Sequence, residues 1–392
     1  EFAEKPRYQG GGSSHINPFR VVSALDAAGE KGRSVTYAKG FSNENDSMTE
    51  QELEKALRTA AEADVAVIFA GLPEIFESEG YDRTSMKLPK CQDRLIEEVL
   101  KVQPNVVVVL HNGSPVELPW ADRRSISVAE LIRPNLQSGQ IDPVIGEACD
   151  WLLYGEANPS GRLAETFPYR LEDNPSFLHF PGNGKRVLYG EDIFVGYRYY
   201  DTKKVPVRYA FGHGLSYTEF TYGDLTLSSA QMTDEDILTV SLKVKNSGKT
   251  EGKEVVQLYV ADLCGISERP VKELKGFAKV HLLPGEEKTV SMEISARNLS
   301  YYEERLGDWY APSGTYRILI GHASDDIRLH ADVVFETKKK LPLRVDFTTT
   351  FGELLDHTKT APVITELLAP LAAAAASAEG MSDEYKKLGE QV

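Results

Sequence analysis

The first half of the chain alternates short apolar runs with segments of helical periodicity. Runs of apolar, largely β-branched residues predict strands that are covered on both faces. The predicted strands are residues 64–71, 105–110 and 126–132, and the predicted helices are residues 91–100 and 147–154. Strands that alternate with helices in this way indicate parallel β/α units. We therefore expect an α/β sandwich domain with a mostly parallel sheet over residues 1–218.

A further helix is predicted before the first of these strands. After the cap candidate Thr49, apolar residues recur at helical intervals, at Leu53, Ala56, Leu57 and Ala60. Spacings of three and four residues bring such side chains to one face of a helix. Residues 50–63 should therefore form a helix that packs on the sheet.

From about residue 219 the pattern changes to short alternating strands separated by turns. The clearest strands are residues 238–245, 255–260, 289–294 and 316–321, with turns at residues 246–248 and 283–287. Alternation of apolar and polar positions with regular turns is typical of a β-sandwich. We expect this second, all-β domain to span residues 219–337.

Residues 338–392 predict a C-terminal extension. A strand-like run at residues 343–347 is followed by an alanine-rich stretch around residues 362–379. Because alanine has the highest intrinsic helix propensity, the extension should be partly helical, with one or two helices.

Composition narrows the possible partners. The formal charge of −15, from 44 Lys and Arg against 59 Asp and Glu, argues against nucleic acid and anionic membrane surfaces. No apolar run reaches the roughly eighteen residues that a membrane-spanning helix needs. The three cysteines lack CxxC spacing and the eight histidines are scattered, so no metal site is expected. An odd thiol favours a reducing compartment, and a cytoplasmic location is expected; a homo-oligomer is possible.

The candidate chemistry lies in residues 77–83, directly after the predicted strand 64–71. The carboxyl ends of parallel strands deliver loops to a crevice. A carboxylic acid that is partly shielded from water there can have its pKa raised toward the range of a general acid. Glu77 and Glu79 are the first candidates. The alternative is structural, because acids that precede a helix also favour its dipole.

A glycine-serine loop at residues 9–18 suggests a phosphate cradle at first sight. It lacks GxGxxG spacing and the lysine of a phosphate-binding loop, so a nucleotide-dependent α/β enzyme is disfavoured and no cofactor is expected. His15 within this loop is better explained as a structural hydrogen-bonding residue than as a catalyst.

Several motifs together resemble the second domain of glycoside hydrolase family three. They are ESEGYDR at residues 77–83, NVVVVLHNGSPV at residues 105–116, YGEANPSGRL at residues 154–163, FVGYRYY at residues 194–200 and YAFGHGLSY at residues 209–217. The chain departs from the family pattern around residues 136–143. KELKGF at residues 272–277 and LPGE at residues 283–286 resemble the fibronectin type III-like domain that follows in this family. The resemblance also implies that the chain begins partway through its first domain.

The resemblance implies a retaining β-glycosidase in which this chain carries only the acid/base. Such enzymes use two carboxyl groups about 5–5.5 Å apart across the scissile bond. Glu77 and Glu79, two residues apart on an extended loop, would lie side by side on one wall, with no room for a sugar between them. Glu79 is the expected acid/base, with Glu77 as the alternative. The nucleophilic aspartate is expected on a (β/α)8 barrel in a preceding segment or a second chain, so this chain alone should be inactive.

Further roles follow from the same resemblance. Tyr81, Asp82 and Arg83 are the candidate substrate-binding residues. Tyr81 is expected to line the sugar pocket, and Asp82 and Arg83 to brace the loop through an ion pair or hydrogen bonds. A terminal β-D-glucoside is the expected substrate, with a β-xyloside second. A non-catalytic carbohydrate-binding or scaffold protein of the same fold is the alternative from another functional class.

Overall fold

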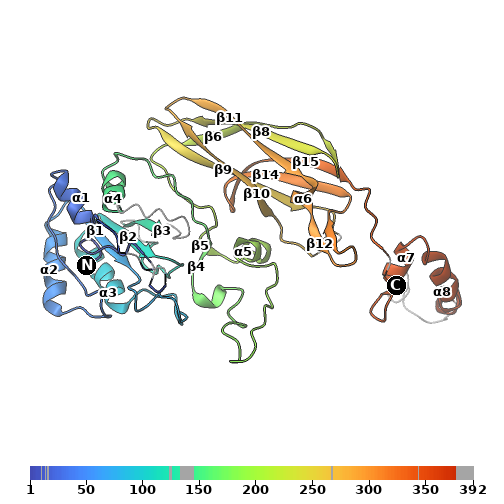
Figure 1. Ribbon diagram of the computed structural model, residues 1–392, viewed down its shortest axis with the longest axis horizontal. Coiled ribbons are helices and arrows are strands. Elements are labelled where there is room, and N and C mark those ends of the chain that lie inside the picture. The colour runs from blue at the N-terminus through green and yellow to red at the C-terminus, as the bar shows by residue number, and fades with distance from the viewer. Residues whose placement is uncertain are drawn as a thin grey trace.

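The computed structural model describes residues 1–376 except residues 10, 14, 16, 123–125, 133–144, 266–267 and 343. An α/β domain comes first, a β-sandwich follows it, and two helices near the C-terminus lie apart from both (Figure 1). The predicted order of an α/β domain followed by an all-β domain is therefore confirmed. The departure expected around residues 136–143 lies outside the described residues.

The first domain is built on a parallel sheet. Its elements are α1 (Ala24–Glu30), α2 (Glu50–Ala61), β1 (Ala66–Gly71), α3 (Lys90–Val102), β2 (Val106–Asn112), β3 (Ile126–Ile132) and α4 (Ile145–Leu153). The strands pair in parallel in the order β1-β2-β3. Helix α1 packs with α4 and helix α2 with α3. The two pairs lie on opposite sides of the sheet in Figure 1.

Local sequence explains these helices. The Thr49 side chain accepts the backbone N–H of Glu52, and the Glu52 carboxylate accepts the N–H of Thr49, which forms a capping box at the start of α2. The residues at helical spacing that point inward from α2 are buried, at Leu53, Ala56 and Ala60. Most of β2 is buried on both faces, as expected for a strand between two helix layers.

The segment between the domains contains short elements. They are β4 (Phe167–Pro168), the 3-10 helix η2 (Leu171–Asp173), α5 (Tyr197–Lys203) and β5 (Val207–Tyr209). Strand β4 pairs antiparallel with β5, which folds this long connection back on itself.

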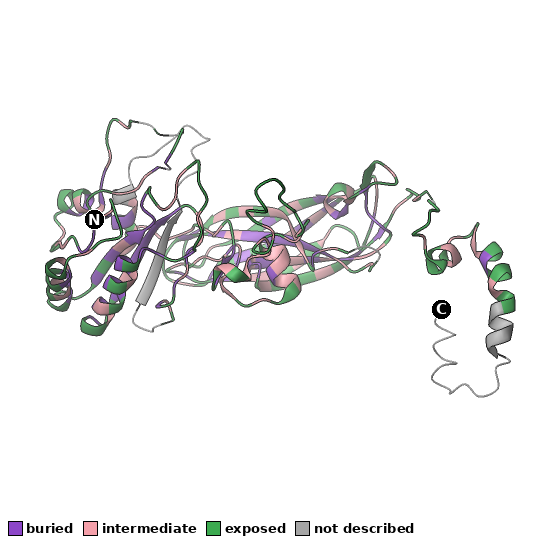
Figure 2. Ribbon diagram, turned by 90° about the horizontal axis from the view of Figure 1, so that it is seen from below, coloured by how far each residue is buried: buried purple, intermediate pink, exposed green. Residues whose placement is uncertain are grey.

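The second domain is a sandwich of two antiparallel layers. Its elements are β6 (Phe220–Leu227), β7 (Gln231–Thr233), β8 (Ile237–Asn246), β9 (Gly252–Asp262), β10 (Glu273–Leu282), β11 (Glu287–Ser295), α6 (Ala296–Leu299), β12 (Tyr301–Glu303), β13 (Asp308–Tyr310), β14 (Gly314–Ala323) and β15 (Asp326–Glu336). One sheet has the order β10-β9-β14-β15-β7, with β7 parallel to β15 at its edge, and the other has the order β11-β8-β6. The buried residues of the two domains form separate cores, visible as two groups of purple ribbon in Figure 2.

The C-terminal region differs in part from the prediction. Helices α7 (Phe351–Asp356) and α8 (Ala361–Ala376) are present. The strand predicted at residues 343–347 is wrong for its described residues, 344–347, which have no sheet edge to pair with. Val345 and Phe347 are fully or largely exposed there. Within the described residues, no helix combines the length and the apolar character needed to span a bilayer.

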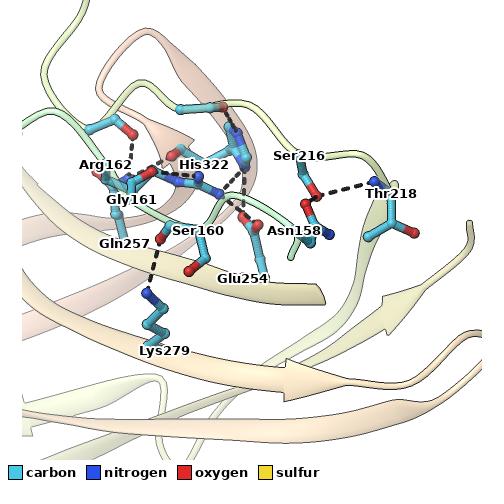
Figure 3. Close-up of polar contacts among 12 residues, drawn as sticks. Asn158, Ser160, Gly161, Arg162, Ser216, Thr218, Glu254, Gln257, Lys279 and His322 are labelled. Atoms are coloured by element: carbon cyan, nitrogen blue, oxygen red, sulfur yellow. Dashed lines mark hydrogen bonds and ion pairs between the residues drawn. The ribbon is translucent and has the colours of Figure 1, made fainter. Parts of the chain in front are cut away.

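A buried charge cluster ties the sandwich to the preceding segment (Figure 3). The fully buried Glu254 carboxylate on β9 accepts Arg162 Nη2 at 2.7 Å and Tyr222 Oη at 2.6 Å. Its Oε1 also lies 2.6 Å from His322 Nδ1, and His322 Nε2 lies 3.1 Å from the Gly214 carbonyl oxygen. Because Arg162 and Gly214 precede the sandwich in sequence, these contacts hold the sandwich to the α/β side of the molecule.

Replacing Glu254 with alanine should destabilise the sandwich strongly. The change leaves the Arg162 guanidinium buried without its counter-charge, which typically costs about 3–5 kcal/mol. Urea unfolding followed by tryptophan fluorescence measures this loss. Asp332→Ala is the matched control, because it removes an exposed carboxylate paired with Arg317. Exposed pairs contribute at most about 1 kcal/mol, so equal losses for the two variants would contradict this account.

Candidate active site

The loop after β1 turns sharply instead of running extended. The backbone N–H groups of Phe76 and Glu77 both donate to the Pro73 carbonyl oxygen, at 2.9 and 3.2 Å. Gly80 adopts a φ of 93°, which favours glycine. The predicted extended loop, with Glu77 and Glu79 side by side on one wall, is therefore wrong. The two carboxylates have different partners.

Glu77 joins three loops at the carboxyl end of the sheet. Its carboxylate lies 3.3 Å from Arg7 Nη1, and both side chains are mostly buried, at 16% and 8% exposed. The Gly113 N–H donates to Oε2 at 3.1 Å and the Ser114 hydroxyl donates to Oε1 at 2.7 Å. Arg7 also donates to the backbone carbonyl oxygens of Leu72 and Glu77. Residues 112–115 therefore lie at the same edge of the sheet as the ESEGYDR loop.

Arg83 braces the loop from its other end. Its Nη1 donates to the Ser114 hydroxyl at 2.7 Å and to the Pro115 carbonyl oxygen at 3.2 Å. Burial lowers the pKa of Arg83, while the nearby carboxylates of Glu77 and Glu165 oppose that shift. Asp82 is exposed and forms no ion pair with Arg83. The sequence analysis expected either an ion pair or hydrogen bonds to hold the loop. The structure contains the hydrogen bonds of Arg83 and no Asp82–Arg83 ion pair.

Glu79 differs from Glu77 in being exposed to solvent. Its Oε2 accepts the Ser13 backbone N–H at 2.6 Å and the Ser13 hydroxyl at 2.7 Å. These two hydrogen bonds, the hydroxyl first, lower the pKa of Glu79 because they favour its charged form. Figure 1 shows the sheet whose carboxyl end carries this loop.

The glycine-serine loop packs directly on Glu79. The Glu79 backbone N–H donates to the Gly11 carbonyl oxygen at 3.2 Å. Gly12 has a φ of 111°, and a Cβ added there would lie 2.4 Å from the Glu79 Cβ. Only glycine therefore allows this approach. The close contact explains the glycines without any phosphate ligand.

Tyr81 and His15 each form hydrogen bonds near the candidate loop. The Tyr81 hydroxyl donates to the Glu74 carbonyl oxygen at 2.6 Å, which leaves the ring 50% exposed beside the loop. His15 lies within 3.1 Å of Gln9 Nε2, as expected of a structural hydrogen-bonding residue.

Sequence analysis missed Glu165. The surrounding protein raises its pKa by desolvation, and the Glu77 carboxylate adds to that shift, while Arg83 opposes it. Glu165 precedes β4 and is far from residues 77–83 in sequence, so no local motif marks it as part of this cluster. Among the described residues, no group of three or more His, Cys, Asp or Glu side chains is arranged to hold a metal ion.

Comparison with known families agrees with the fold. Residues 1–217 match the glycosyl hydrolase family 3 C-terminal domain, and residues 254–324 match a fibronectin type III-like domain. The chain belongs to glycoside hydrolase family 3. The resemblance inferred from its motifs is confirmed.

Family 3 relatives match most of the chain. Thermostable β-glucosidase B of Acetivibrio thermocellus is 47% identical over 371 residues, which are 94% of this chain and 48% of the relative. An exo-α-(1→6)-L-arabinopyranosidase of Bifidobacterium longum is 39% identical over 90% of this chain and 45% of its own length. This chain thus spans about half the length of the curated relatives it matches.

Solved family 3 structures superpose well on the chain. The β-glucosidase of Bifidobacterium adolescentis gives a TM-score of 0.83 at 37% identity, covering 93% of this chain and 52% of that one. A Kluyveromyces marxianus β-glucosidase solved with glucose gives a TM-score of 0.66 at 41% identity, covering 74% of this chain and 34% of that one.

Removing the Ser13 hydroxyl should raise the pKa of Glu79. Ser13→Ala deletes the hydrogen bond that contributes most to the lowered value and keeps the backbone N–H. Carboxyl carbon chemical shifts followed through a pH titration measure the change. Ser85→Ala is the control, since the Ser85 hydroxyl accepts the neighbouring Lys87 N–H and has no other hydrogen bond within the described residues. A Glu79 pKa that is the same in both variants would rule out the hydroxyl as the cause.

Proposed function

We propose that this chain carries the general acid/base of a retaining β-glycosidase, with Glu79 in that role. The observation that carries the proposal is the exposed Glu79 carboxylate, held by Ser13 at the carboxyl end of a parallel sheet. Crevices at this edge are the usual ligand sites of such sheets. The family 3 membership supports glycoside hydrolysis as the reaction class.

The contacts of Glu77 favour a structural role for that residue. Arg7, Gly113 and Ser114 together direct four hydrogen-bond or ion-pair contacts to Glu77 atoms, one of them to its backbone carbonyl. An acid that must donate and then recover a proton needs access to the leaving oxygen and to water. Glu79 has that access and Glu77 is mostly enclosed. The alternative assignment to Glu77 is therefore the weaker one.

Because the pKa of Glu79 is lowered, other parts of the active site must raise it before Glu79 can donate a proton. A carboxylate that is favoured in its charged form is a poor proton donor near neutral pH. Exclusion of water and a second carboxylate about 5–5.5 Å away would both raise its pKa. We propose that a (β/α)8 barrel, in a preceding segment or a second chain, supplies this nucleophilic aspartate and covers Glu79. Arg83 holds the loop, and the exposed ring of Tyr81 lines the sugar side.

The substrate proposed is a terminal, nonreducing β-D-glucoside. Two β-glucosidases among the matched proteins support this choice. A β-xyloside is the second candidate. The arabinopyranosidase relatives add α-L-arabinopyranosides to the panel that should be assayed. A scaffold or carbohydrate-binding role without catalysis is the alternative function.

The 392-residue chain by itself should not turn over an aryl β-glucoside measurably. It supplies an acid/base, and the proposed mechanism needs a nucleophile from the barrel. The release of nitrophenol from purified chain is measured with and without a barrel-bearing polypeptide of the family. Turnover by the chain alone would overturn the composite site, and no turnover with any barrel would favour the scaffold alternative.

In the assembled enzyme, Glu79→Ala should slow hydrolysis of alkyl β-glucosides by roughly 10²–10⁴-fold, because these leaving groups need a proton. A nitrophenyl glucoside leaves without protonation, so its first step should be affected much less. Added azide should then accelerate the second step, since it attacks the glycosyl-enzyme without a general base. Steady-state rates with both substrates, with and without azide, measure these effects.

Two variants on the same loop serve as controls for that experiment. Glu77→Ala should impair folding of the loop and show no rescue by azide. Glu74→Gln keeps the size of an exposed acid whose side chain lies beside Gly11, and it keeps the backbone carbonyl that accepts the Tyr81 hydroxyl, so it should behave as the unmodified enzyme. Azide rescue of Glu77→Ala and not of Glu79→Ala would exchange the two roles.

A further inference from the structure

Three polar side chains near the candidate loop carry hydrogen-bonding atoms that no described residue contacts. Arg83 donates from Nη1 to Ser114 and Pro115, whereas its Nη2 is buried without a partner in the described part of the chain. The Tyr200 hydroxyl is also buried without a partner there, in a side chain that is 3% exposed. The Glu165 carboxylate forms no hydrogen bond or ion pair within the described residues. Arg83, Glu165 and Tyr200 thus form a polar cluster with unused donors and acceptors.

The polar cluster combines residues from three segments of the chain. Arg83 follows β1, Glu165 precedes β4 by two residues, and Tyr200 lies on α5. Strand β4 pairs with β5, and Arg208 Nη2 on β5 donates to Asp122 Oδ2 at 3.0 Å. Asp122 belongs to the loop after β2, which also contains the partners of Arg83, so β4 and β5 are held against the loop that binds Arg83. Figure 1 shows β4 and β5 between the parallel sheet and α5.

Electrostatic interactions indicate that the three side chains are neighbours. Burial is the main cause that lowers the pKa of Arg83 and raises that of Glu165, and each of the two charges opposes the shift of the other. Burial also raises the pKa of Tyr200, and the carboxylates of Asp173 and Glu165 add to that shift. Interactions between charges more than about 10 Å apart are largely screened in solution. Glu165 therefore lies close to both Arg83 and Tyr200.

The chemistry of the polar cluster favours a neutral ligand that is rich in hydroxyl groups. A guanidinium donates hydrogen bonds, an ionised carboxylate accepts them, and a phenol hydroxyl does both. Neighbouring hydroxyls of a sugar also donate and accept, so they match this set. An anionic ligand would be repelled by the carboxylates of Glu77 and Glu165, and a cationic ligand by the guanidinium of Arg83. A glycosyl residue is therefore the ligand class that fits the cluster.

We infer that Arg83, Glu165 and Tyr200 bind hydroxyl groups of the substrate's leaving group and favour a glycosyl leaving group over an apolar one. This inference rests on the acid/base role proposed for Glu79. In a retaining glycosidase the nucleophile attacks the anomeric carbon of the cleaved sugar, so the barrel that supplies it must enclose that sugar. The acid protonates the leaving oxygen, and the loop that carries both Glu79 and Arg83 therefore lies on the side of the leaving group.

Burial of the unused donors makes the cluster selective. A sugar hydroxyl that contacts the Arg83 Nη2 and the Tyr200 hydroxyl satisfies both groups, whereas an apolar leaving group leaves them without partners. Sites built to hydrogen-bond a substrate hydroxyl discriminate strongly against analogues that lack it. Glu165 is exposed, so its carboxylate is accessible to a ligand from solvent.

The test compares two substrates of the assembled enzyme, cellobiose and nitrophenyl β-glucoside, which differ in their leaving groups. Tyr200→Phe removes only the buried hydroxyl, and Glu165→Ala removes an exposed carboxylate. Each change should lower kcat/KM for cellobiose by roughly tenfold more than kcat/KM for the nitrophenyl glucoside, because only cellobiose has hydroxyls on its leaving group. Most of the loss should be a higher KM for cellobiose, as expected when binding contacts are removed.

Two nearby residues supply matched controls. Tyr199→Phe makes the same change one residue earlier on α5, and Glu172→Gln neutralises an exposed acid on η2. Both controls should leave the ratio of the two kcat/KM values as it is in the unmodified enzyme. Because Glu165 is exposed, Glu165→Ala should fold even if Tyr200→Phe proves unstable, and Glu165→Gln gives a second variant of the same size as the original residue.

A purely structural role of the cluster would lower kcat/KM equally for both substrates, and an unchanged ratio in the Glu165 and Tyr200 variants would overturn the inference. Its failure can be separated from that of the proposed function, because azide rescue of Glu79→Ala reports on the acid/base role alone. Azide rescue together with an unchanged ratio would reject only the role of the cluster. An assembled enzyme that hydrolyses neither substrate would reject the proposed function and this inference with it.

Discussion

The candidate site depends on one carboxylate, that of Glu77. It receives Arg7 from the N-terminal segment, and the Gly113 N–H and Ser114 hydroxyl from the loop after β2. Burying this carboxylate with fewer donors would cost free energy of folding. The hydrogen bonds therefore fix the N-terminal segment, the loop after β1 and the loop after β2 relative to one another. Glu79 lies two residues after Glu77, whose position these contacts fix. The glycine-serine loop can therefore contact Glu79. The acid/base role proposed for Glu79 thus relies on Glu77, for which we propose a structural role.

A second charge cluster connects the sandwich to this arrangement. Arg162, which binds the buried Glu254, is three residues before Glu165. Glu165 in turn interacts electrostatically with Glu77 and Arg83. The contact of the sandwich with Arg162 therefore fixes the segment of residues 162–165, whose last residue lies near the candidate site. In this way an all-β domain can affect the geometry of the site through the backbone that it holds.

The sequence predicted the fold and the loop better than the roles within the loop. Apolar periodicity is local, so it located β1, β2, β3 and α2 to within a few residues, and the motif ESEGYDR marked the candidate loop. The partners of its two acids are remote: Arg7 is 70 residues from Glu77, and Ser13 is 66 residues from Glu79. No local pattern encodes such contacts. The prediction of a strand at residues 343–347 was wrong for a related reason. A strand must pair with the edge of a sheet, and the local sequence does not show whether the fold places such an edge nearby.

The acid/base role proposed for Glu79 requires conditions that differ from those in the described residues. Glu79 has a pKa lowered by Ser13 and is exposed to solvent. An acid catalyst needs the opposite conditions, namely less water and more negative charge nearby. The hydrogen bonds from Ser13 fix the orientation of Glu79 before any cover arrives. The proton affinity of this carboxylate would then be set by whatever encloses it, so the same residue can be well oriented and yet inactive until the site is closed.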